Sequence, residues 1–210
     1  LRLVLYGQPP SETVASAGDA VKHVVTRARL EAAPRAWDLL SLALSAVTAD
    51  SAVLRADSPD GWTRDFALEI AVSDPDFWNS QASAVEKMLA FLTTDRWQLT
   101  FRPGGYAPAP PPEDPVRPDE DCVTLLSGGL DSLIGAVDLV ATGWRPLAVS
   151  QVARGDAAKQ VEFAASIGDG LRHLQLNHNA NTPGRSEKSQ RSRSLIFIAF
   201  GILAATTLRT

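Results

Sequence analysis

The chain of 210 residues is long enough for one large domain or two small ones, and its 45% share of hydrophobic residues allows a sizeable core. The net charge of −4 argues against a protein whose main task is to coat nucleic acid, so direct nucleic-acid binding is not expected. The single cysteine, Cys122, excludes a disulfide framework or a cysteine-rich zinc site in this stretch and is typical of a reducing cytoplasm. The longest apolar run, residues 195–205, is shorter than the ~20 residues that a bilayer requires, so no membrane association is expected.

The first half of the chain mixes two periodicities and predicts a small α+β domain over residues 1–102. Strands are predicted where apolar and polar residues alternate, at residues 1–7, 65–72 and 97–101. Helices are predicted where apolar residues recur at helical spacing, at residues 35–49 and 80–92. In the first of these helices the apolar face consists of Trp37, Leu40, Leu44 and Val47.

A proline-rich segment separates this half from the next. Seven prolines lie in residues 103–121 (PGGYAPAPPPEDPVRPDED). Such a run cannot hold a helix or an inner strand, because proline lacks the backbone N–H that both need. We therefore expect residues 103–120 to form an extended linker between two domains.

The second half, residues 121–210, alternates strands and helices. Continuous apolar runs predict strands at residues 122–127, 145–152 and 173–177. Helices are predicted at residues 131–143, with Leu133, Val137 and Val140 on one face, at 157–167 after an Asp156 cap, and from about Arg191 onward. This order predicts an α/β domain whose parallel sheet is covered on both faces. Because the sequence starts at Leu1 without a methionine and stops at Thr210 just after an apolar helix, we expect it to be a piece of a longer protein.

The stretch LLSGGLDS, residues 125–132, joins the first of these strands to its helix. Ligands of parallel sheets bind at the carboxyl ends of the strands, which is where this stretch lies. Gly128 and Gly129 allow backbone N–H groups to point into one concavity, the helix start adds free N–H groups, and Ser127 and Ser132 add hydroxyls. Together these groups predict a cradle for a pyrophosphate. The alternative is a plain glycine turn in which Asp131 or Ser132 only caps the helix.

Neither common nucleotide-binding motif is present. A kinase-type P-loop needs a lysine that this loop lacks, and no GxGxxG occurs. The SGGxDS pattern between a strand and a helix instead resembles the PP-loop ATP pyrophosphatases, whose sheet is of the Rossmann-like, HUP type. Members of that superfamily split ATP between the α and β phosphates and pass AMP to a substrate oxygen. The resemblance implies that ATP is held by Leu126, Ser127, Gly128, Gly129, Leu130, Asp131 and Ser132.

The same resemblance implies that Asp131 positions Mg²⁺ and that Asp131 and Ser132 act in catalysis. Arg191 and Arg193 open the last helix, where a cation opposes the helix dipole unless an anion lies near it. We expect at least one of these guanidiniums, with Arg193 favoured, to contact the ATP phosphates or a substrate carboxylate. The alternative is that both arginines are solvated residues beside a core helix.

Within the superfamily, the chain resembles the 7-cyano-7-deazaguanine synthases of queuosine biosynthesis, in which a Gly-Arg-Asn element opens the corresponding helix. Here Arg193 and Ser194 stand in that place. Those synthases carry a cluster of zinc-binding cysteines near their end, so the resemblance implies a structural Zn²⁺ after residue 210. The extra N-terminal domain, with RAWDLLSLALSAVTAD and FLTTDRWQLTF, resembles the synthase-like proteins of bacterial anti-phage defence operons, and other proteins of such an operon are expected partners.

Other polar residues carry weaker predictions. Arg154, Gly155 and Gln160 follow the second strand, where family members recognise adenosine, although an ordinary connection is equally compatible. His178, Asn179 and Asn181 lie in the loop after the third strand, where an ordinary polar loop is favoured. His173, Cys122 and the tryptophans are expected to be structural.

Two functions follow from these patterns. The first is a cytoplasmic carbon–nitrogen ligase that adenylates a small carboxylate, such as that of a 7-deazaguanine, and releases pyrophosphate. The second is a nucleotide-binding subunit of a defence complex whose ATP chemistry is weak. Retention of every SGGxDS position favours the first.

Overall fold

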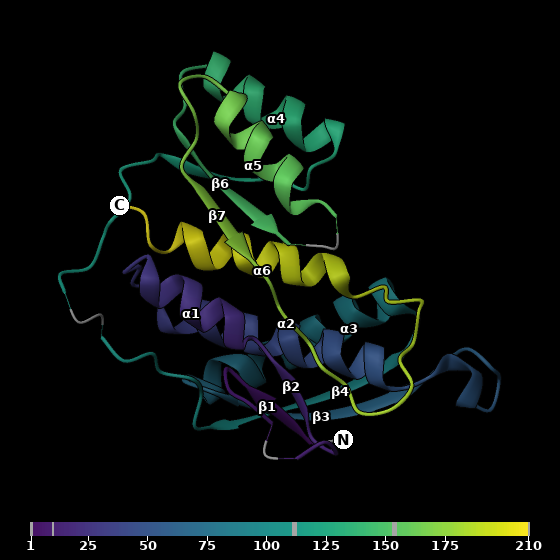
Figure 1. Ribbon diagram of the computed structural model, residues 1–210. Helices are drawn as coiled ribbons and strands as arrows, with labels where there is room; N and C mark the ends of the chain where they lie inside the picture. Colours follow the sequence, from purple (N-terminus) through teal and green to yellow (C-terminus); the bar gives the residue numbers. More distant parts are fainter. Residues whose placement is uncertain (1, 10, 111–112, 153–154, 210) are drawn as a thin grey trace.

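The computed structural model describes residues 2–9, 11–110, 113–152 and 155–209 (Figure 1). The first half contains β1 (Leu3–Leu5), β2 (Ala15–Ala17), α1 (Asp19–Arg27), α2 (Pro34–Ala52), a short 3-10 helix (Arg55–Asp57), β3 (Asp65–Val72), α3 (Pro75–Thr93) and β4 (Arg96–Pro103). The second half contains β5 (Cys122–Leu125), α4 (Leu130–Ala141), β6 (Pro146–Gln151), α5 (Ala157–Ser166), β7 (His173–Leu176) and α6 (Arg193–Ala205). The chain is therefore a mixed α/β fold.

The strands form small parallel sheets. In the second half the order is β5-β6-β7, and both neighbouring pairs are parallel. This confirms the parallel pairing that the apolar runs predict, and β6 is buried from Pro146 to Ser150. In the first half β1 pairs with β2 and β3 pairs with β4, again in parallel.

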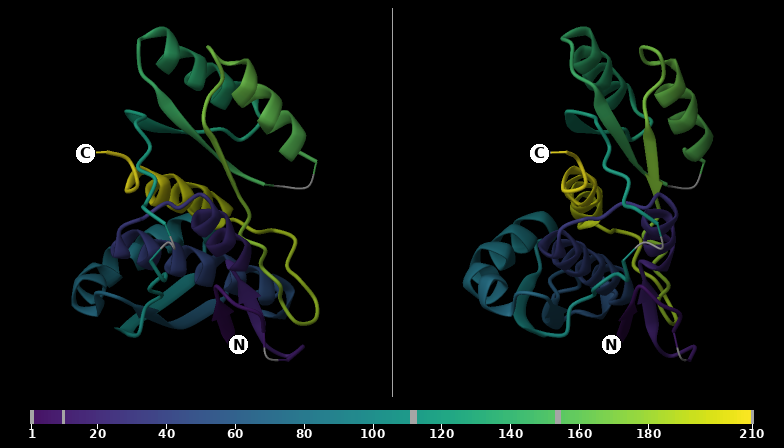
Figure 2. Two further views of the ribbon diagram at one scale, coloured as in Figure 1. Left: turned by 60° about the vertical axis from the view of Figure 1, so that its left-hand side comes forward. Right: turned by 90° about the vertical axis from the view of Figure 1, so that its left-hand side faces the viewer.

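Helices cover both faces of the β5-β6-β7 sheet. Helices α4 and α5 lie on one face and α6 lies on the other, as Figures 1 and 2 show. The close fit of α6 depends on Gly201, because a Cβ atom there would lie 2.8 Å from Leu125 Cδ2 of β5. Burial of α4 is less complete than predicted: Val137 is 44% exposed, and Leu130 and Ile134 are exposed as well.

Helix α2 lies between α6 and the two sheets of the first half (Figures 1 and 2). This position explains why α2 is buried on nearly every side. The sequence predicts one apolar face, but Leu42, Ala43 and Ala46 are also buried because they face a second layer. The packing of α2 on α6 joins the buried residues of both halves into one continuous hydrophobic cluster.

The elements of the first half follow local signals where those signals are strong. β3 has the predicted bounds, and Trp97, Leu99 and Phe101 of β4 are buried as their alternation predicts. Helix α3 starts earlier than predicted, because Pro75 occupies its first turn and the Asp74 side chain accepts the Phe77 N–H at 3.2 Å. β2 and α1 have no counterpart among the predicted elements.

Residues 104–110 and 113–121 contain no helix or strand, which agrees with the proline-rich composition. The segment is nevertheless attached to the rest of the protein. The Val116 N–H donates to Arg29 O at 2.9 Å, and the Arg209 N–H donates to Pro118 O at 3.2 Å. Among the helices of the described residues, none combines the length and the apolarity that crossing a membrane needs.

A matched pair of glycines tests the packing of α6 on the sheet. Gly201→Val should lower the free energy of unfolding by ~1–3 kcal/mol, because the new side chain overlaps Leu125. Gly135→Val in α4 should be nearly neutral, because a Cβ there meets no atom within 4 Å among the described residues. Urea unfolding at neutral pH measures both variants, and equal effects would contradict the packing.

Candidate functional site

The SGGLDS loop leaves the carboxyl end of β5 and enters α4. Leu126 anchors it: the side chain is fully buried, the N–H donates to Val149 O at 2.8 Å, and the carbonyl accepts the Ser150 hydroxyl at 2.5 Å. Both backbone groups of Leu126 are therefore used inside the protein. The following residues Ser127, Gly129, Leu130 and Asp131 are exposed.

Two serines close the loop across its base. Ser127 and Ser132 place their hydroxyl oxygens 2.9 Å apart, and Ser132 Oγ also accepts the Ser127 N–H at 3.1 Å. Ser132 Oγ donates to the Gly129 carbonyl at 2.9 Å, and the Gly129 N–H donates to Ser127 Oγ at 3.3 Å. The motif thus holds its own shape through side-chain to backbone hydrogen bonds.

The turn needs glycine at one of its two positions. Gly128 has φ +88°, a region that L side chains rarely adopt, whereas Gly129 has φ −91° and an extended ψ. Gly129 is the N-cap of α4, and no side chain in the described part of the chain caps this helix. The alternative role of Asp131 or Ser132 as the side-chain cap of this helix is therefore not observed.

This geometry leaves backbone donors at the start of α4. The first N–H groups of a helix have no partner within it, and here these belong to Leu130, Asp131 and Ser132. The helix dipole adds partial positive charge at the same place. Among the residues that the structure describes, no carboxylate of the protein itself caps this helix start. An external anion can therefore bind there.

Gln160 joins the loop to the two strands beside it. Its Nε2 donates to Ser127 O at 3.2 Å and to Gln151 O at 3.0 Å, and its Oε1 accepts from Gln175 Nε2 at 3.1 Å. Only 1% of Gln160 is exposed, so its side chain supports the loop from beneath. The neighbouring candidate Gly155 has φ +96°, and Arg154 lies outside the described residues.

A second polar group lies at the same edge of the sheet. Gln151, at the end of β6, places Nε2 3.2 Å from Nδ1 of His178. Burial lowers the pKa of His178, and the positive charge of Arg193 lowers it further. The Gln160 and Gln151 contacts thus continue from the SGGLDS loop to His178, and Arg193 is exposed at the first position of α6.

The other loop residues have structural contacts. Asn181 pairs with Ser16 of β2, and Asn179 Oδ1 accepts the Ala20 N–H at 3.2 Å. His173 places Nε2 2.8 Å from the buried Ser150 hydroxyl, and burial lowers its pKa. The contacts of Asn179 and Asn181 attach the segment after β7 to the first half of the chain.

The two arginines at the start of α6 have different surroundings. The anion that this helix start needs is Asp50 of α2, whose Oδ2 accepts the Arg191 N–H at 2.9 Å, the Ser192 N–H at 3.0 Å and the Ser192 hydroxyl at 2.7 Å. The Arg191 guanidinium lies over the Trp62 ring at 4.8 Å. Because Asp50 already supplies a negative charge there, the position of Arg191 no longer predicts a bound anion. Arg193 is exposed at the first position of the helix.

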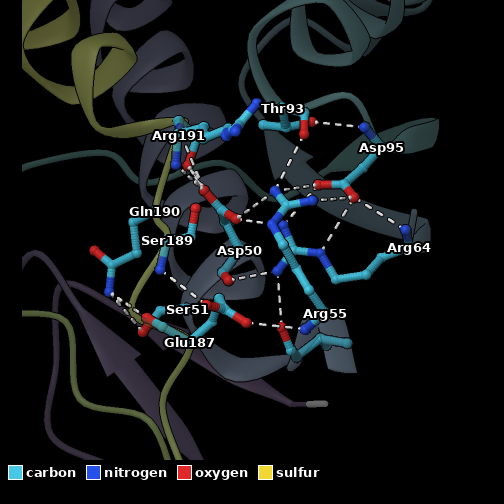
Figure 3. Close-up of polar contacts among 12 residues, drawn as sticks. Asp50, Ser51, Arg55, Arg64, Thr93, Asp95, Glu187, Ser189, Gln190 and Arg191 are labelled. Carbon is cyan, nitrogen blue, oxygen red and sulfur yellow. Dashed lines mark hydrogen bonds and ion pairs between the residues drawn. The ribbon is translucent and has the colours of Figure 1, made fainter. Parts of the chain in front are cut away.

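Asp50 belongs to a buried network of two carboxylates and two guanidiniums (Figure 3). Its Oδ1 accepts from Arg64 Nη2 at 2.5 Å, and Asp95 accepts from both Arg64 and Arg55. These four side chains are at most 4% exposed. Burial alone would raise the pKa of Asp95, but hydrogen bonds from Arg64 outweigh it and hold that pKa below its ordinary value.

Sequence reasoning missed this network, although one signal was present. Asp50 follows eleven apolar or small residues of the same helix, residues 39–49, and a buried acid needs a cationic partner or several hydrogen-bond donors. The partners are distant in the sequence, so the signal predicts that a cation is needed without naming Arg64. The network shows that both Asp50 and Asp95 have structural contacts.

A scan against protein-family models and searches of curated proteins and of solved structures found no match to this chain. Among the described residues, no group of three or more His, Cys, Asp or Glu side chains is placed to hold a metal ion.

The Asp50 network predicts a large stability effect. Asp50→Asn keeps the shape of the side chain but leaves Arg64 without one of its two carboxylates. We expect the free energy of unfolding to fall by ~3–5 kcal/mol, measured by urea unfolding. The control Asp65→Asn removes an exposed ion pair with Arg96 and should cost ~0–1 kcal/mol. Similar losses in the two variants would contradict the importance of the network.

Proposed function

We propose that this chain binds ATP at the SGGLDS loop and cleaves it between the α and β phosphates, as the PP-loop ATP pyrophosphatases do. The observation that carries the proposal is the start of α4, where the N–H groups of Leu130, Asp131 and Ser132 lack an internal cap among the described residues beside a glycine at φ +88°. A helix start with such free donors is a general site for phosphate groups. The proposal includes the Rossmann-like character of the β5-β6-β7 sheet.

Each residue of the loop has a proposed role. The backbone N–H groups hold the β and γ phosphates, and the paired hydroxyls of Ser127 and Ser132 keep the loop in shape and donate to phosphate oxygens when ATP is bound. Asp131 is exposed in the first turn of α4, where its carboxylate can hold Mg²⁺. A single carboxylate is enough for this role, because Mg²⁺ commonly takes its remaining ligands from phosphates and water.

The proposed substrate is a small carboxylate, and Arg193 is the residue proposed to contact it. Arg193 is exposed at the first position of α6, and its charge lowers the pKa of His178, whose ring lies beside Gln151. The carboxylate oxygen takes AMP from ATP, pyrophosphate leaves, and an amine then displaces AMP to form an amide. The resemblance to 7-cyano-7-deazaguanine synthases makes a 7-deazaguanine carboxylate the first compound to try.

The biological setting is proposed from the same resemblance. The single cysteine and the proposed use of ATP support a reaction in the cytoplasm. Other proteins of an anti-phage operon are the proposed partners. A structural zinc site would require cysteines outside this sequence.

A second candidate function is favoured by the openness of the loop. Ser127, Gly129, Leu130 and Asp131 are exposed, and the three cavities described for this chain are lined by other residues. A nucleotide-binding subunit with weak chemistry would have such a loop. It would bind ATP with the same residues but release little pyrophosphate.

Product analysis tests the proposed reaction. With Mg²⁺ and a candidate carboxylate, we expect AMP and pyrophosphate in equal amounts, separated by ion-exchange chromatography. ADP and phosphate as the main products would contradict the proposal. ATP binding without any turnover on a panel of carboxylates would favour the second function.

Gly129→Val tests the placement of the phosphates. The backbone of Gly129 is extended, and its Cβ would meet only Ser127 Oγ at 3.4 Å, so valine should fold but crowd the phosphates. ATP affinity should fall at least ~100-fold, about 2.7 kcal/mol, while melting stays normal. Gly135→Val on the same helix is the control and should keep the affinity. Gly128→Val is unsuitable, because its positive φ would strain the fold itself.

Arg193→Ala tests the contact with the substrate. A charge-assisted hydrogen bond contributes ~1.5–3 kcal/mol, so activity or substrate affinity should fall at least ~10-fold. Folding should be unaffected, because Arg193 is exposed and fills no core volume. Arg191→Ala is the matched control, since that guanidinium lies over Trp62. Full activity in the Arg193 variant would show that this arginine is only a solvated residue.

A further inference from the structure

Two strand edges in the first half of the chain face each other across a cavity. The cavity has a volume of about 690 Å³, and it is lined by Leu3 and Leu5 of β1 and by residues 65–71 of β3. β1 and β3 belong to different two-stranded sheets, and both sheets pack against α2. Figure 1 shows these two short sheets beside each other below α2.

The backbone of β1 directs hydrogen-bonding groups into this cavity. On the side of β1 that faces β2, the Arg2 carbonyl accepts the Ala15 N–H, and the Tyr6 N–H donates to the Ala17 carbonyl. Residues 2, 4 and 6 therefore direct their backbone groups toward β2, since the direction alternates along a strand. The N–H and C=O groups of Leu3 and Leu5 consequently point the opposite way.

The backbone of β3 does the same from the other side. Arg64 O accepts the Arg96 N–H at 2.9 Å, and Val72 O accepts the Gly105 N–H at 3.0 Å. The even-numbered residues of β3 thus face β4, and the odd-numbered residues direct their N–H and C=O groups away from it. These odd-numbered residues are Asp65, Ala67, Glu69 and Ala71, and all four line the cavity.

The outer edges of the same sheets are covered. On β4, Asn79 bonds both the N–H and the C=O of Phe101, and Glu86 accepts the Leu99 N–H at 2.8 Å. On β2, Ser16 exchanges both backbone bonds with Asn181. Among the residues that the structure describes, the inner edges of β1 and β3 have no such partner, so they are open to another strand.

We propose that the cavity is a binding slot for an extended peptide of another protein, which enters as a strand between β3 and β1. The completed sheet would have the order β4-β3-peptide-β1-β2. Only an extended polypeptide presents N–H and C=O groups on both sides at the spacing that two facing edges require. This inference does not depend on the proposed ATP chemistry.

The slot also selects side chains. Its floor is a row of small residues on α2, namely Ser41, Ser45 and Ala49, which leaves room for apolar side chains of the peptide. The charged residues at its rim are Asp65, Glu69 and Arg102, with a net charge of −1. The slot therefore favours a peptide that alternates apolar residues facing α2 with basic residues facing outward.

A short fluorescein-labelled peptide of alternating valine and lysine is the probe. We expect its anisotropy to rise when the full chain is added, and hydrogen exchange of the amides in residues 3–5 and 65–71 to slow at the same time. The same peptide with N-methylated valines and lysines cannot donate backbone hydrogen bonds and should not bind. Equal binding of the N-methylated peptide would overturn the proposal.

Protein variants separate strand pairing from charge. Ala67→Pro removes one N–H that faces the slot and leaves the β3–β4 bonds intact, because proline is tolerated at a strand edge; binding should weaken about tenfold. Glu69→Lys reverses a rim charge and should also weaken binding, whereas the matched Glu162→Lys on α5 should not. Glu69→Lys additionally tests the slot if Ala67→Pro fails to fold.

Two results would overturn the assignment to a partner peptide. The first is slow exchange of the Ala67, Glu69 and Ala71 amides in the free chain at concentrations where it is a monomer, since the open edge of β3 would then already be paired within the chain. The second is a dimer in light scattering whose dissociation speeds that exchange, since the slot would then hold a second copy. Failure of the probe to bind together with unchanged exchange also contradicts the proposal.

Discussion

A carboxylate buried between two helices determines how this protein is arranged. Asp50 comes from the last turns of α2, and it accepts the N–H groups of Arg191 and Ser192 just before α6 together with a guanidinium from the β3 side. This contact holds the start of α6 in place, and α6 in turn covers one face of the β5-β6-β7 sheet. Arg193, the first residue of α6, is exposed at this helix start.

The network around Asp50 has no net charge. Two carboxylates and two guanidiniums cancel in charge, and nearly all of their hydrogen-bonding atoms have partners; Arg55 Nε is an exception among the described residues. Taking such charges out of water costs several kcal/mol per ion, so the gain in stability over a hydrophobic core is small. What the network supplies is a single way to join α2, β3, β4 and α6, since any shift would leave a buried charge without its partner.

The parts of the fold that could be predicted are those with local signals. The alternation in residues 65–72 gives β3 its bounds, and the apolar runs of the second half give the parallel order of β5, β6 and β7. β2 could not be predicted, because Ala15–Ala17 has little strand propensity and exists as a strand through its bonds to β1 and Asn181. Its partners are distant in sequence, so no window of the chain contains the cause.

The candidate site likewise contains a part that local sequence predicts and a part that depends on residues distant in the sequence. The SGGLDS loop is contiguous, and its turn, hydroxyl pair and helix start all follow from eight neighbouring residues. Arg191 shows the opposite case: a cation at a helix start predicts a bound anion, but the anion is Asp50, which lies 141 residues earlier. Gln160 likewise follows β6 in sequence, but only the fold places its amide beneath Ser127.

The most direct test of the nucleotide site is an ATP titration followed by the backbone amide signals of an isotope-labelled chain in NMR spectra. The account predicts that the largest and first shifts occur at residues 128–132, since their N–H groups would bind the phosphates. Shifts confined to another region, such as the residues around Trp37, with residues 128–132 unchanged at saturating ATP, would contradict it.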